Sequence, residues 1–95
     1  MKVRWTTQAE QDGFDIRTYI AAYNVRAAIA TDELFGETAS RLEDFPMLGK
    51  PELVAGTREL IAHESHRLIY EVDWASHAVW VLALVHTARQ WPPVR

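Results

Sequence analysis

The sequence contains no cysteine, and this single absence removes several kinds of chemistry. Disulfide bridges, thiolate nucleophiles and metal sites built on cysteine are all excluded. The beginning of the chain has no apolar stretch of the kind found in secretory signals, and the longest apolar run, residues 78–85, is too short to cross a bilayer. We therefore expect a cytoplasmic protein that has no membrane partner.

A surplus of basic residues is also missing, because 10 Lys and Arg stand against 13 Asp and Glu and the net charge is −3. Proteins that hold RNA or DNA by the phosphate backbone usually carry a positive surplus. The acidic excess lies in residues 1–45, whereas residues 46–95 are balanced and contain every histidine. The composition is compatible with a locally positive site on the second half, but not with a broad basic surface.

Apolar residues are plentiful, at 48% of the chain, and they include four Trp, three Tyr and three Phe. This composition is typical of a chain with a buried core and not of a disordered one. A length of 95 residues suits one small domain. We therefore treat residues 1–95 as a single domain.

The first quarter of the chain predicts a short edge strand over residues 2–6 and a helix over residues 7–23. Thr6 or Thr7 can cap this helix, and Glu10 follows Thr7 at the spacing of a capping box. Small or apolar residues recur every three or four positions, which is typical of a helix with one face against a core. This seam consists of Ala9, Gly13, Ile16, Ile20 and Tyr23.

A second helix is predicted over residues 25–42, with Asn24 as the cap that separates it from the first. So short a connection implies an antiparallel helical hairpin. Pro46 ends the second helix, and residues 46–56 read as a loop with two prolines and two glycines. The apolar stripe of this helix is Ala28, Phe35, Ala39 and Leu42.

Three strands are predicted after the loop, over residues 57–64, 66–73 and 78–86, with turns so short that neighbouring strands are antiparallel. The last strand is apolar on both faces and should therefore be central, with His86 ending the face that bears Trp80, Leu82 and Leu84. The element order is β-α-α-β-β-β. We expect an α+β fold with the helical hairpin on a three-stranded antiparallel meander.

Cationic, imidazole and aromatic side chains gather in these strands and just beyond them. Arg58 and Arg67 supply guanidinium groups, which match phosphate oxygens in bidentate fashion. His86 can shuttle a proton near neutral pH, and Trp91 can stack on a base. With Arg89 nearby, we expect several of these residues to converge on one anionic group.

A structural interpretation of the same residues stays open. The two arginines can form cross-strand ion pairs with Glu59 and Glu71. His86 can be a hydrogen-bonded histidine at the end of its strand, and Trp91, next to two prolines, can close the core.

Other catalytic and cofactor motifs are weak or missing. Residues 63–66 contain two histidines and a glutamate, but they span a predicted turn and lack the helical spacing of zinc proteases. Ser65 has no acid partner or oxyanion hole that would complete a hydrolase triad. Because P-loop and dinucleotide fingerprints are missing too, we expect neither a metal nor a cofactor.

The chain resembles the RelE/ParE toxins of bacterial toxin–antitoxin modules along essentially its whole length. The matching pieces are Trp5 with the first helix, Tyr19-Ile20, Asn24, and the segments FPMLGKP (45–51), GTREL (56–60), RLIY (67–70) and HTARQWP (86–92). The resemblance implies a toxin that is neutralised in a hetero-oligomer by an antitoxin whose C-terminal segment wraps around it. We expect that segment to cover strand 78–86 and the grooves beside the helical hairpin.

The resemblance also implies one of two targets. RelE-like toxins cut messenger RNA on the ribosome with basic residues and a C-terminal acid or base, whereas ParE-like toxins poison DNA gyrase. This chain has only Lys50 where the ribonucleases have a lysine cluster, and it has no tyrosine near its C-terminus. Together with the acidic balance, this favours the ParE side.

Three hypotheses follow. A gyrase poison would use Arg58, Arg67, Arg89 and Trp91 to bind its target. A ribosome-dependent endoribonuclease would use Arg58, Arg67 and His86 for catalysis. A third possibility is a non-toxic protein that only binds the antitoxin and acts as a co-repressor.

Overall fold

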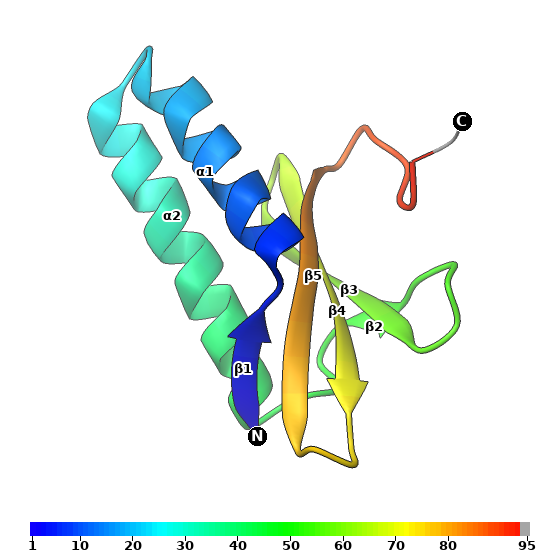
Figure 1. Ribbon diagram of the computed structural model, residues 1–95. Coiled ribbons are helices and arrows are strands. Elements are labelled where there is room, and N and C mark those ends of the chain that lie inside the picture. Colours follow the sequence, from blue (N-terminus) through cyan, green and yellow to red (C-terminus); the bar gives the residue numbers. More distant parts are fainter. Residues whose placement is uncertain (94–95) are drawn as a thin grey trace.

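The chain runs through one strand, two helices and then a group of strands, as Figure 1 shows for the computed structural model, which describes residues 1–93. No helix within this described part combines the length and the apolar character needed to cross a membrane. The elements are β1 (Lys2–Trp5), α1 (Thr7–Ala21), α2 (Val25–Ser40), the 3-10 turn η1 (Arg41–Glu43), β2 (Lys50–Pro51), β3 (Thr57–His63), β4 (His66–Asp73) and β5 (Ala78–His86).

The strands form one five-stranded sheet in the order β1-β5-β4-β3-β2. The β3-β4-β5 meander is antiparallel as predicted, and β1 adds to it in parallel beside β5. The two helices lie antiparallel on one face of the sheet, with α1 packed on β5 and α2 on β3 (Figure 1). The α+β fold and the central position of β5 are thus confirmed. The short strand β2, inside the expected loop, was not predicted.

Helix α1 begins with a different cap geometry from the expected capping box. The hydroxyl of Thr6 accepts a hydrogen bond from the backbone N–H of Ala9 at 3.1 Å, so Thr6 is the N-cap and Glu10 lies one position too far to complete the box. The helix ends at Ala21, and Tyr23, which is 80% exposed, is not part of its seam. Those two details of the prediction were wrong, although the rest of the seam faces the protein.

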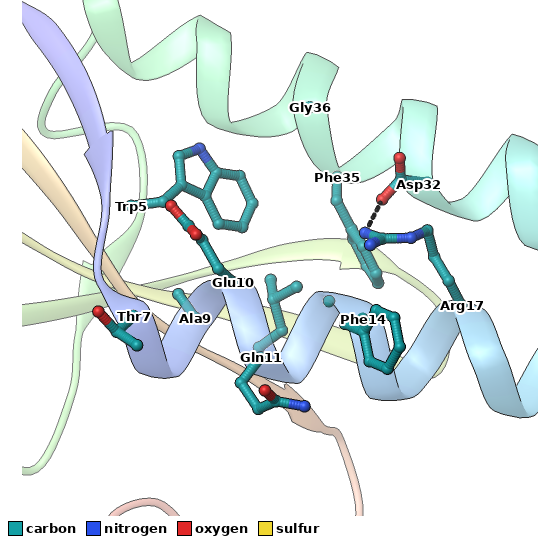
Figure 2. A pocket seen from close by; sticks show the side chains of 12 residues that line it. Trp5, Thr7, Ala9, Glu10, Gln11, Phe14, Arg17, Asp32, Phe35 and Gly36 are labelled. Carbon is teal, nitrogen blue, oxygen red and sulfur yellow. Dashed lines mark hydrogen bonds and ion pairs between the residues drawn. The ribbon is translucent and has the colours of Figure 1, made fainter.

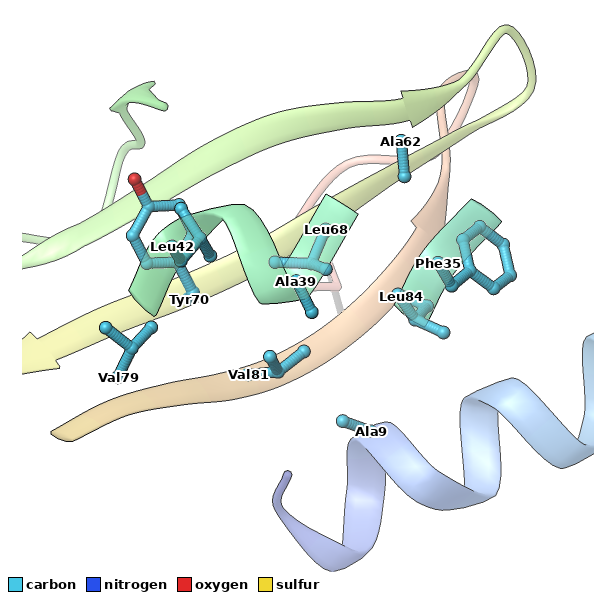
Figure 3. Close-up of a cluster of buried hydrophobic side chains, with 10 residues drawn as sticks. All are labelled: Ala9, Phe35, Ala39, Leu42, Ala62, Leu68, Tyr70, Val79, Val81 and Leu84. Atoms are coloured by element: carbon cyan, nitrogen blue, oxygen red, sulfur yellow. The ribbon is translucent and has the colours of Figure 1, made fainter. Parts of the chain in front are cut away.

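Helix α2 has the cap and the buried stripe that its sequence predicts. Asn24 is the N-cap and accepts a hydrogen bond from the N–H of Ala27 at 3.0 Å. The stripe packs into a core to which both helices and three strands contribute, as Figure 3 shows. The buried residues of this core are Ala9, Phe35, Ala39, Leu42, Ala62, Leu68, Tyr70, Val79, Val81 and Leu84.

A register shift changes which side of β5 faces the helices. Ile69 pairs with Ala83 but Tyr70 pairs with Val81, so β5 has one extra residue at this point. As a result Val81 and Leu84, which simple alternation would place on opposite faces, both enter the core. The single face predicted from Trp80 to His86 is therefore wrong. Asp12 of α1 binds the N–H of Leu84 through its carboxylate at 3.0 Å, next to the shift.

Gly49 fixes the loop before β3 against the sheet. Its N–H donates to the hydroxyl of Tyr70 at 2.8 Å, and its carbonyl accepts from Nε of Arg58 at 2.9 Å. A Cβ atom at this position would lie 2.4 Å from the carbonyl oxygen of Glu59. The close approach of loop and strand therefore requires a glycine here.

Candidate functional site

The strand registers separate the residues that were expected to converge. Arg58 pairs with Tyr70, and Arg67 pairs with Ile61. Cross-strand partners share a face of a sheet, and Tyr70 is in the core under the helices. Arg58 therefore lies on the helix-covered face and Arg67 on the opposite one.

His86 lies on the same face as Arg58 but at the other end of the sheet. It pairs with His66, four residues along β4 from the partner of Arg58, which corresponds to about 13 Å at roughly 3.3 Å per residue. The prediction that these side chains converge on one anionic group is therefore wrong. A role of each residue alone in binding the target or in catalysis stays a prediction.

Arg67 is held by internal contacts on the face away from the helices. Its Nη1 forms ion pairs with Glu52, at 2.5 Å, and with Glu59, and its Nη2 donates to the carbonyl of Arg89 at 3.0 Å. The side chains of the three ion-paired residues are between 8% and 14% exposed. The ion-pair interpretation thus describes Arg67 in this structure, with Glu59 and Glu52 as partners in place of Glu71.

The environment of Glu59 keeps it ionised. Burial alone would raise the pKa of Glu59, but hydrogen bonds with Glu52, Arg67 and Lys50 and the charge of Arg67 outweigh burial and lower the pKa from 4.5 to about 2. Lys50 reaches this carboxylate from β2, with 3.2 Å between Nζ and Oε1. The short strand β2 therefore contributes a second cation to the cluster.

The remaining predicted residues lie near the end of β5. Arg89 is exposed in the turn that follows the strand, and its N–H donates to the carbonyl of His86 at 2.9 Å. Trp91 is half-buried and lines a groove beside α1. The guanidinium of Arg58, in contrast, is half-buried at the other end of the sheet, where it binds Gly49.

Sequence reasoning missed a cluster of three histidines. His66 lies between His63 and His86, with ring centroids 6.2 Å and 5.3 Å away respectively. The two residues that flank the predicted turn gave a partial signal. Their meeting with His86 depends on a register shift in each strand pair, which the sequence pattern alone does not fix.

Hydrogen bonds assign the tautomers of two of these histidines. Nδ1 of His63 accepts the N–H of Ser65, and Nδ1 of His86 accepts the N–H of Ala88, each at 3.1 Å. Each neutral ring therefore carries its proton on Nε2. A histidine that binds a metal through Nε2 usually donates from Nδ1, so this arrangement disfavours a metal. Residues 1–93 also contain no group of three or more His, Asp or Glu side chains placed to hold one.

His66 is the most enclosed of the three rings. Burial lowers the pKa of His66 below 6.5, and the positive charges of His86 and His63 lower it further. Its Nδ1 is buried without a hydrogen-bond partner among the described residues, and its ring packs edge-on against Phe35 at 5.7 Å between centroids. The cluster thus connects the core to the surface.

The histidines line one end of a groove of about 1050 Å³. One wall is α1, with Asp12 and Asp15 at its rim, and the other is the segment after β5, with Arg89 and Trp91. Its apolar floor is made by Ile16, Ile20 and Leu84. The groove is large enough for a helix or an extended peptide and carries donors at one end only.

A second hollow, of about 570 Å³, lies between the two helices, and Figure 2 shows its lining. Phe14 and Phe35 contribute apolar surface, and the ion pair of Arg17 with Asp32, at 2.9 Å, crosses it. A Cβ atom added at Gly36, in the middle of α2, would meet no other atom within 4 Å. Packing within the toxin therefore does not require this glycine.

Comparison with known proteins gives consistent matches. Residues 3–91 match the family described as "ParE toxin of type II toxin-antitoxin system, parDE". The protein named "Putative toxin Y4kP" of Sinorhizobium fredii is 30% identical over 94 residues, which cover 98% of this chain and 95% of that protein.

Solved structures share the fold. The chromosomal ParDE system of P. aeruginosa matches with a TM-score of 0.79 and 20% identity, covering 90% of this chain and 95% of that one. The YoeB/ParE toxin of Agrobacterium tumefaciens matches at 0.62 and 18%, covering 90% and 98%. The RelBE2 toxin–antitoxin complex of Mycobacterium tuberculosis matches at 0.59 and 28%, covering 92% and 91%. With the family match over nearly the whole chain and the shared fold, this protein belongs to the ParE toxin family of type II toxin–antitoxin systems.

Proposed function

We propose that this ParE-family toxin arrests growth by poisoning DNA gyrase in the cytoplasm, without cleaving RNA, and that a cognate antitoxin neutralises it. The observation that carries the proposal is the state of Arg67. Two buried carboxylates hold its guanidinium on the sheet face opposite to Arg58 and His86. The groups that an RNA-cleaving site would need are thus kept apart.

Energetics support the same conclusion. An RNase of this family type would need Arg67 to stabilise the charge that develops on phosphate in the transition state. To do so, Arg67 would have to leave Glu52 and Glu59, and their carboxylates would remain buried without this cation. A binding toxin, in contrast, needs no such rearrangement and can use exposed groups such as Arg89.

An antitoxin partner is supported by the relatives and by exposed apolar surface. The structures of the P. aeruginosa and M. tuberculosis relatives are described as toxin–antitoxin systems or complexes. The helical hairpin exposes large apolar side chains, which are Phe14, Tyr19, Tyr23, Val25 and Ile29. Strand β5 is paired on both edges, so the partner would cover the hairpin and its grooves and would not add a strand at β5.

The proposal is tested by expressing the toxin without its antitoxin and following the SOS response and cell filamentation. We expect both to rise before protein synthesis falls, because trapped gyrase leaves broken DNA. The His86→Gln variant should act like the wild type, since this proposal assigns no proton transfer to His86. Growth arrest with an early loss of messenger RNA and no SOS response would contradict it.

The endoribonuclease function is a second candidate because of the histidine cluster. His63, His66 and His86 lie together in a groove that Arg89 and Trp91 also line, so a proton shuttle and a cation are close to one another. Under this alternative His86→Gln abolishes toxicity while antitoxin binding survives. Harmless expression of a folded protein would instead support the non-toxic co-repressor.

A further inference from the structure

The groove beside α1 has hydrogen-bond donors at one end whose own rings are already oriented. Backbone N–H groups bind Nδ1 of His63 and of His86, which leaves Nε2–H as the free donor of each ring. Arg89 lines the same end and is exposed. Three donors at one end match a group with several acceptor oxygens.

The opposite wall has the other sign of charge. Asp12 and Asp15 stand on α1 along the groove, and both carboxylates accept hydrogen bonds from glutamine side chains of the same helix. Between the two walls lies the apolar floor of Ile16, Ile20 and Leu84. A ligand that fits all three parts is apolar along its length and carries its acidic group at the end near Arg89.

We propose that this end of the groove is a carboxylate-binding site, in which Arg89, His63 and His86 receive an acidic side chain from the antitoxin segment that covers Ile16 and Ile20. The inference rests on the proposed function in one respect, namely that the toxin has an antitoxin. The site fixes the direction of the bound segment, because its acidic residue must lie away from the wall formed by Asp12 and Asp15.

A nucleic-acid strand fits the groove less well. A strand lying along it would bring successive phosphates beside Asp12 and Asp15, and like charges would repel it. A peptide carries its negative charge at one position and apolar groups at others, which matches the arrangement. The carboxylate of a protein is therefore the ligand that the groove favours.

The site is tested by titrating the purified toxin with the antitoxin encoded beside its gene, using calorimetry. Arg89→Ala should raise Kd by about 10- to 100-fold, because a hydrogen bond to a charged group contributes roughly 1.5–3 kcal/mol. Arg89→Lys should recover part of the loss, and His63→Phe should raise Kd several-fold. The matched control is Arg26→Ala, an exposed arginine at the start of α2 outside the groove, which should leave Kd within about twofold.

Equal effects of Arg89→Ala and Arg26→Ala overturn the inference, as does a wild-type toxin that does not bind the antitoxin. A single-stranded oligoribonucleotide is titrated in parallel. If Arg89→Ala weakens its binding but leaves antitoxin binding unchanged, the site recognises phosphate and the carboxylate assignment is wrong. Failure of the wild-type toxin to affect gyrase contradicts only the proposed target, because the titration contains no gyrase.

Discussion

The structure predicts that removing the guanidinium of Arg67 damages the fold before it affects any target. Arg67 is the shared partner of Glu52 and Glu59, whose side chains are 8% and 10% exposed. Arg67→Ala would leave both carboxylates buried, with the exposed Lys50 as the remaining cation seen near Glu59. Breaking a buried ion pair from one side costs about 3–5 kcal/mol.

That cost is large for a chain of this size. Domains of this kind are stable by about 5–15 kcal/mol, so the variant would lose a substantial share of its free energy of unfolding. Neutralising the whole cluster should be milder, because apolar replacements of a buried ion pair are often neutral or stabilising. We expect the triple variant Arg67→Met, Glu52→Leu and Glu59→Leu to recover most of the stability lost in Arg67→Ala.

The assay is urea unfolding of the wild type, the single variant and the triple variant, followed by circular dichroism. The midpoint should fall strongly for Arg67→Ala and return toward the wild type in the triple variant. The reasoning is refuted if Arg67→Ala unfolds within about 1 kcal/mol of the wild type but has lost its toxicity. That result would make Arg67 a residue of target contact or catalysis.

Three further predictions concern protons and glycines. Because the pKa of Glu59 falls from 4.5 unfolded to about 2 folded, its stabilisation is complete above pH 4.5 and is lost as pH falls toward 2; Glu59→Gln should flatten this part of a urea-midpoint profile. The pKa of His66 is lowered from 6.5, so stability should fall as pH drops below 6.5, and an unchanged slope in His66→Phe would contradict this. Gly36→Ala should raise the free energy of unfolding by up to about 1 kcal/mol, since nothing obstructs a Cβ there, whereas Gly49→Ala should lower it by about 1–3 kcal/mol. Equal shifts of the melting temperature in these two variants would contradict the packing described for Gly49.

Much of the fold was readable because its signals are local. The cap at Asn24, the stripe of α2 and the apolar strand β5 each follow from a pattern within one element. The short strand β2 has no such pattern, because only its pairing with Arg58 and Glu59 makes it a strand. Contacts of that kind arise in three dimensions and leave little trace in the sequence.

The candidate site was less predictable because it depends on register. Alternation shows that Arg58 and Glu59 point to opposite faces, but only the pairing of Arg67 with Ile61 puts Arg67 beside Glu59. The register shift between Ile69 and Tyr70 then moves the end of β5 relative to a simple alternation, which decides the face of His86. A pattern that identifies residues correctly can therefore still misplace them relative to one another.

The most direct test of the central claim uses purified gyrase, supercoiled DNA and the toxin freed from its antitoxin. We predict that cleaved DNA accumulates in proportion to the toxin, that adding antitoxin abolishes it, and that His86→Gln behaves like the wild type. Absence of cleaved DNA, together with cleavage of messenger RNA on ribosomes by the same preparation and its loss in His86→Gln, would contradict the account.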